Sequence, residues 1–112
     1  MRKDQQEHID AFLKEMRGVM ITKGSDYSGS EDTLKNLKLL DRYGYDTSHG
    51  LLLRMGDKIS RLATLLKTEG KPNHESLHDN ILDLANYSCL LDMHLKEKAK
   101  REAEGEEDVM LP

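Results

Sequence analysis

Apolar residues in this chain recur every three or four positions, which is the spacing of an amphipathic helix. We find no stretch with the two-residue alternation that is typical of a half-buried strand. Two prolines, Pro72 and Pro112, occur in the 112 residues, so long helices can form without interruption. The sequence therefore predicts an all-α fold, a compact helical bundle of three longer helices and one short helix.

Start and stop signals divide the chain into these four helices. Ser30 is a suitable N-cap for the short helix, and Gly44 is a suitable end. Thr47 or Ser48 is the expected N-cap of the helix that follows. The predicted ranges of the three longer helices are about 4–21, 48–68 and 73–97.

Each long helix has one predicted core-facing stripe of apolar residues, and these stripes make only a thin core. One Phe, four Tyr and no Trp are available to enlarge it. Association with further copies would bury more apolar surface, so we expect a homo-oligomer. The stripes are Ile9, Phe12, Leu13, Met16 and Met20; Leu52, Met55, Ile59, Leu62 and Leu66; and Leu77, Ile81, Leu84, Ser88, Leu91 and Leu95.

The composition argues against several classes of protein. Seventeen basic and 21 acidic residues leave a net charge of −4, so no global field attracts DNA or anionic lipid. The single cysteine, Cys89, precludes an internal disulfide and a zinc ribbon, and we expect a buried thiol. No apolar run approaches the roughly 20 residues that span a bilayer. We expect a cytoplasmic protein without direct nucleic-acid or membrane partners.

One helical domain is expected to occupy residues 1–97. The residues that follow Lys96 are almost all charged or small until Asp108. Such a composition buries too little apolar surface to offset the entropy of ordering the chain. We therefore expect residues 98–112 to form a disordered tail.

Two polar stripes lie beside the apolar stripes of the last two long helices, with three- and four-residue spacing. Antiparallel packing would bring them side by side. One interpretation is a ladder of interhelical salt bridges. The other is a nucleotide–metal site, in which Asp57, Asp79 and Asp83 bind Mg²⁺ and the basic residues bind the phosphates. The stripes are Arg54, Asp57, Lys58 and Arg61, and Glu75, Asp79, Asp83 and Asn86.

The segment Lys23–Ser28 is a second candidate for nucleotide contacts. Lys23 supplies a cation, Asp26 a carboxylate and Tyr27 a ring for stacking, next to two glycines in a predicted turn. The alternative is that these are ordinary turn residues. Three histidines, His8, His49 and His94, are isolated in the sequence and are expected at the surface.

Three motifs together resemble the nucleotide-modification-associated domain, a small helical family of bacteriophages and bacteria. They are K-G-x-D-Y-S at Lys23–Ser28, R-M-G-D-K-I-S-R-L at Arg54–Leu62 and E-S-L-x-D-x-x-x-D-L-A-N-Y at Glu75–Tyr87. That domain is similar in turn to the all-α nucleoside triphosphate pyrophosphatases, the MazG and dimeric dUTPase group. The resemblance covers roughly residues 10–95.

The resemblance implies nucleotide handling, with Mg²⁺ held by carboxylates on two facing helices. The pyrophosphatases look to carry E-x-x-E on one helix and E-x-x-D on the next. The corresponding residues here are Arg54-x-x-Asp57 and Asn80-x-x-Asp83, so an arginine and an asparagine replace two glutamates. An arginine repels a metal ion and attracts a phosphate, so the replacement favours binding over hydrolysis.

We therefore expect a protein that binds a nucleotide or nucleotide derivative through its phosphates and Mg²⁺. Hydrolysis, as a weak nucleoside triphosphate pyrophosphohydrolase, would use Glu75 to orient the attacking water. Asn86, Tyr87, Asp26 and Tyr27 would contact the base or sugar. Two alternatives stay open at this point: a binding protein without turnover, which sequesters a signalling nucleotide or serves base modification, and a purely structural helical oligomer.

Overall fold

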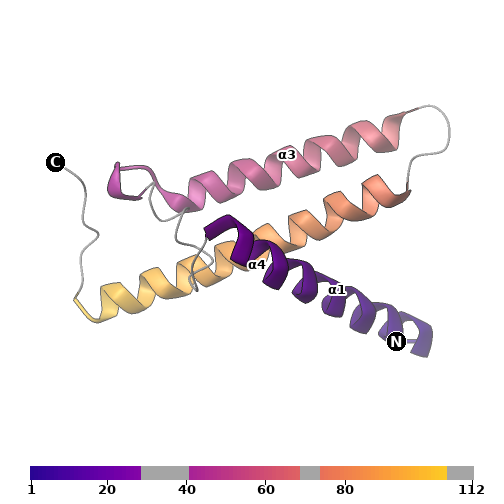
Figure 1. The fold of residues 1–112 in the computed structure, drawn as a ribbon, viewed down its shortest axis with the longest axis horizontal. Helices are drawn as coiled ribbons and strands as arrows, with labels where there is room; N and C mark the ends of the chain where they lie inside the picture. The colour runs from indigo at the N-terminus through magenta and orange to yellow at the C-terminus, as the bar shows by residue number, and fades with distance from the viewer. Residues whose placement is uncertain (29–40, 69–73, 106–112) are drawn as a thin grey trace. The chain divides into compact units, whose positions relative to one another are not determined.

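A computed structural model describes residues 1–28, 41–68 and 74–105. Between residues 24 and 28 it describes the backbone but not the side chains. Within these ranges the chain forms helices α1 (Lys3–Ser28), α3 (Thr47–Lys67) and α4 (His74–Ala103), and no strand (Figure 1). The predicted all-α class is confirmed for this part of the chain. Most of the predicted short helix lies outside the described residues.

The chain divides into two compact units, Met1–Thr33 and Leu34–Pro112. Helix α1 belongs to the first unit. It continues past the predicted end at residue 21 and through Lys23–Ser28, so the prediction of a turn there was wrong. Gly24 costs about 1 kcal/mol relative to alanine in a helix interior and serine costs less, so a single glycine does not end a helix.

In the second unit α3 and α4 lie side by side and run antiparallel (Figure 1). Their shared core contains three fully buried leucines, Leu51, Leu82 and Leu90. The polar side chains of Thr47, Asn86 and His94 are also buried. Three of these six buried residues are therefore polar, so the described part of this core is small and only half apolar.

Two aspartates that precede helix α3 accept hydrogen bonds from the backbone amides of its first turn. Asp46 is the N-cap, and its Oδ1 accepts a hydrogen bond from the Ser48 backbone amide at 2.9 Å. Oδ1 of Asp41 accepts one from the Thr47 amide at 3.0 Å. The predicted caps, Thr47 and Ser48, are therefore the first residues of the helix. Gly44 makes the preceding turn with φ of 83°, a conformation that favours glycine.

Helix α4 continues six residues past its predicted end at 97. Lys100 and Arg101 lie in the last turn of this extension, where the helix dipole favours cations. Gly105 follows the helix with φ of 78°. Residues 98–103 are thus helical, contrary to the expectation of a tail from residue 98, and residues 106–112 lie outside the described part.

The core-facing stripes differ from the predicted ones. On α4 the buried residues, Leu82, Asn86, Leu90 and His94, recur every fourth position. Ile81 and Leu95, which were predicted to face the core, are exposed. On α3 Leu51 is buried whereas Leu52, Ile59 and Leu66 are exposed. Both helices have apolar residues on two adjacent faces, so periodicity alone did not indicate which face packs inward.

None of the helices in the described residues combines the length and the apolar character that a membrane crossing requires.

Candidate functional site

One ion pair between α3 and α4 joins the two predicted polar stripes. Nζ of Lys58 lies 3.0 Å from Oδ2 of Asp83, and only 15% and 24% of these side chains are exposed. The pair formed by Lys96 and Asp92 on α4 is, by contrast, 78% and 67% exposed. Because water screens the Lys58–Asp83 pair less, its charges act more strongly on each other and on a ligand.

One helical turn away, a second contact links the same two helices. The guanidinium carbon of Arg54 lies 6.0 Å from the centre of the Tyr87 ring, at the outer limit of a cation–π interaction of about 6 Å. We use "α3/α4 edge" for the surface that these two contacts define, which consists of Arg54, Asp57, Lys58 and Arg61 on α3 and Glu75, Asp79, Asp83 and Tyr87 on α4.

The carboxylates predicted to bind Mg²⁺ are spread along this edge. Asp57 and Asp79 are exposed, and Asp83 is engaged by Lys58. In the described ranges, the three do not form a group whose oxygen atoms lie within 4.8 Å of one another. Arg61 and Glu75 are also exposed. Their roles, like that of the aspartates, stay predictions.

Behind the edge lies the buried amide of Asn86. It is 8% exposed, and its Oδ1 has no hydrogen-bond partner among the described residues. A buried oxygen in this state is an acceptor that a ligand donor can satisfy. Asn80, one of the two replaced glutamate positions, uses its Nδ2 to donate to the Ser76 carbonyl oxygen at 2.7 Å.

The predicted contacts in the first unit rest on the sequence alone. Lys23, Asp26 and Tyr27 are part of α1, and the side chains of Asp26 and Tyr27 lie outside the described part. Helical backbone at these residues replaces the turn that was expected to approach a ligand closely.

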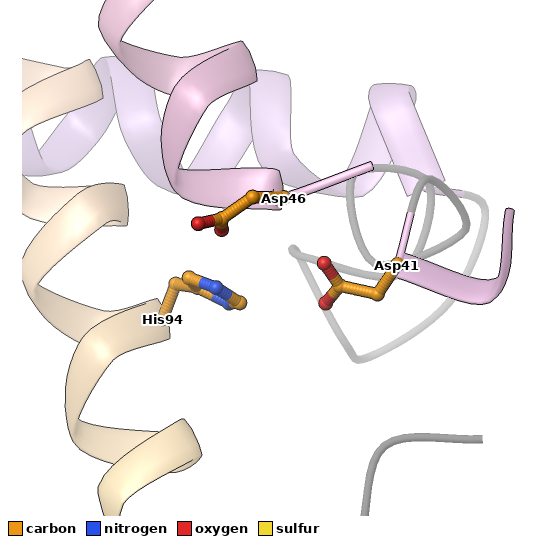
Figure 2. Close-up of side chains that lie close together, drawn as sticks. All are labelled: Asp41, Asp46 and His94. Carbon is orange, nitrogen blue, oxygen red and sulfur yellow. The ribbon is translucent and has the colours of Figure 1, made fainter. Parts of the chain in front are cut away.

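A second cluster lies near the start of α3 and was missed in the sequence. Asp41, Asp46 and His94 each offer one ligand atom, and these atoms lie within 4.8 Å of one another (Figure 2). His94 was expected at the surface, but it is 1% exposed. A signal was present, because His94 continues the four-residue series of Leu82, Asn86 and Leu90. The pKa of Asp46 is lowered, chiefly by the hydrogen bond from the Ser48 amide.

Comparison of the chain with protein-family models, with curated proteins and with solved structures gives no match. The case for function therefore depends on the side chains of the two clusters and on the motifs in the sequence.

Proposed function

We propose that the α3/α4 edge binds a phosphorylated nucleotide or nucleotide derivative together with Mg²⁺. The observation that carries this proposal is the shielded Lys58–Asp83 pair, next to the Arg54–Tyr87 contact on the same edge. These contacts bring together three kinds of group. A cation recognises a phosphate, a carboxylate binds its metal ion, and an aromatic ring stacks on a base.

The phosphates would bind to Arg54, Lys58 and Arg61. Arginine presents a planar fork of donors that matches two phosphate oxygens, whereas lysine acts as a compact charge. Lys58 is the least exposed of the three, so its attraction to a phosphate is the least screened by water. We therefore assign the largest share of phosphate affinity to Lys58.

The acidic residues suit a Mg²⁺ ion that is already bound to the phosphates of a nucleotide. Such an ion keeps several waters and takes one or two carboxylates in addition to phosphate oxygens, so a closed protein cage is unnecessary. Asp83, together with Asp57 or Asp79, would supply these carboxylates. When bound, Mg²⁺ would neutralise phosphate charge. Lys58 would then exchange its Asp83 partner for a phosphate oxygen.

The base or sugar would contact Tyr87 and Asn86. The Tyr87 ring is half-buried and offers a face for stacking. Oδ1 of Asn86, which is buried and has no partner within the described ranges, could accept a hydrogen bond from an amino or hydroxyl group once side-chain movement uncovers it. A ligand that donates to this oxygen removes the cost of leaving it unpaired, about 1–3 kcal/mol. The edge therefore favours nucleotides over inorganic phosphate.

We propose that hydrolysis is slow or absent. Arg54 and Asn80 occupy the places where the pyrophosphatases look to carry glutamates, and Asn80 is already bonded to its own helix. Fewer carboxylates mean fewer metal ions to activate a water molecule. Glu75 is the group that we propose to orient such a water if turnover occurs.

A thermal-shift screen with and without Mg²⁺ tests the proposal, using the four deoxynucleoside triphosphates and the corresponding ribonucleotides. A ligand at 100 times its Kd adds about 2.7 kcal/mol of stability, which is readily measured as a rise in Tm. We expect a nucleotide-specific rise that increases with Mg²⁺. An unchanged Tm with every nucleotide would refute nucleotide binding and support a purely structural role for the Lys58–Asp83 ion pair.

Chromatography of the incubated nucleotides tests the claim about turnover separately. We expect the nucleotide that raises Tm to be recovered intact over the time of the binding experiment. Rapid release of pyrophosphate and monophosphate would refute slow hydrolysis while leaving the binding proposal in place.

A further inference from the structure

His94 is an imidazole buried between helices α3 and α4. It is 1% exposed, and both Nδ1 and Nε2 are without a partner among the described residues. Buried polar groups almost always have partners, because an unpaired one loses its bonds to water without replacement. The ring extends from α4 toward the carboxylates of Asp41 and Asp46 (Figure 2). A group that binds to all three would satisfy the imidazole.

The two carboxylates are each held in place through one oxygen atom, and the other oxygen of Asp46, Oδ2, lies 4.0 Å from Nε2 of the exposed His49. Oδ1 of Asp41 and Oδ1 of Asp46 accept the hydrogen bonds from the first amides of α3. Capping therefore orients both aspartates before any ligand arrives.

We propose that Asp41, Asp46 and His94 bind a divalent transition-metal ion, with Zn²⁺ and Mn²⁺ as the principal candidates. One imidazole nitrogen and two carboxylate oxygens suit such ions, whereas Mg²⁺ prefers oxygen ligands alone. Ligand atoms about 2.0–2.2 Å from one ion lie roughly 3–4 Å apart, so small side-chain movements bring the observed group onto it. Water would occupy the remaining positions.

This site is separate from the α3/α4 edge. Asp46, the N-cap of α3, precedes Arg54, the first residue of the edge on this helix, by eight residues, which corresponds to about 12 Å along the helix. The ion would join the start of α3 and the turn before it to the C-terminal half of α4. Its role would be to fix the helix pair at the end opposite to the α3–α4 connection.

Calorimetric titration of the full chain, freed of metal by chelation and dialysis, tests the site with Mn²⁺ and Zn²⁺ separately. We expect one ion per chain and a rise in Tm on binding. His94→Leu should abolish binding of this ion. In metal-free buffer the same variant should be at least as stable as the parent, because it replaces an unpaired buried polar group with an apolar one.

Asp41→Asn is the second test variant, since asparagine keeps the oxygen that accepts from the Thr47 amide. It should fold as the parent does and bind Mn²⁺ at least tenfold more weakly. Asp10→Asn, at an exposed carboxylate of α1, and Cys89→Ser, at the thiol, are matched controls, and both should bind as the parent. The proposal is overturned if the parent shows no saturable binding, or if His94→Leu and Asp41→Asn bind Mn²⁺ as tightly as it does.

Discussion

Lys58 and Asp83 show how strongly the role of a charged residue depends on its burial. In an exposed pair, the loss of one partner costs about 0.2–1 kcal/mol. Lys58 and Asp83 are mostly shielded from water, so removal of one costs the other a charged partner in a place where water compensates for it only in part. Arg61, in the same predicted stripe, is exposed and lacks this constraint.

We predict that Lys58→Ala lowers the free energy of unfolding by about 1–3 kcal/mol, because a partly buried carboxylate loses its charged partner. Arg61→Ala should change it by less than about 0.5 kcal/mol, as is usual for exposed residues. Urea denaturation of both variants measures the difference. If both variants lower the free energy of unfolding by the same small amount, the Lys58–Asp83 pair is as well hydrated as an exposed ion pair.

Asp46 is the second residue with a definable energetic role, as the N-cap of α3. In metal-free buffer, Asp46→Ala should destabilise the protein by about 0.5–2 kcal/mol, because it removes the acceptor for the Ser48 amide. Asp46→Asn should stay close to the parent, since asparagine caps equally well. Thermal unfolding in the presence of EDTA measures both. An Asp46→Ala variant as stable as the parent would exclude a capping role.

At the level of the helices, apolar spacing predicted that α3 and α4 exist, and approximately where they begin. It failed to indicate their inward faces, because Leu51 and Leu52 are adjacent and both suit a helical stripe. The α3/α4 edge followed from charge spacing and antiparallel packing. The cluster of Asp41, Asp46 and His94 did not, since it brings together residues about 50 positions apart that share no sequence motif.

The adjacent pair Leu51 and Leu52 provides a direct test of the inward face of α3. Leu51 is fully buried and Leu52 is 51% exposed. Leu51→Ala should cost about 2–5 kcal/mol, the range for a buried leucine. Leu52→Ala should cost less than about 1 kcal/mol, because much of its side chain already contacts solvent. Denaturant unfolding compares the two, and the reverse order would mean that α3 packs through its predicted face.

At the level of the whole molecule, we propose that copies of the chain associate through exposed apolar residues. Leu52, Ile59 and Leu66 are all exposed on α3 and recur every seven residues, the repeat of helices that pack against one another. Ile81 and Leu95 are separated by twice this interval on α4 and are also exposed. A second copy would remove this apolar surface from water.

Sedimentation velocity measures the predicted association. The parent should sediment with a mass that is a multiple of the 12.8 kDa chain. Ile59→Lys places a charge in the centre of the exposed series and should reduce the mass to that of one chain, with helical circular dichroism retained. Lys67→Ala, at the end of α3, is a control that should not alter the mass. A monomeric parent would contradict this proposal.

The most direct test of the central claim is calorimetric titration of the Mg²⁺-bound nucleotide that gives the largest Tm rise. Three proteins are compared well below their melting temperatures: the parent, the Lys58→Ala/Arg61→Ala double variant and the control Lys96→Ala. Each lost contact to a phosphate should cost about 1.5–3 kcal/mol, or roughly one to two decades in Kd, while the control binds as the parent does. A double variant that binds with the parent's Kd, yet unfolds at lower urea, would contradict the claim and assign the α3/α4 edge to the stability of the fold.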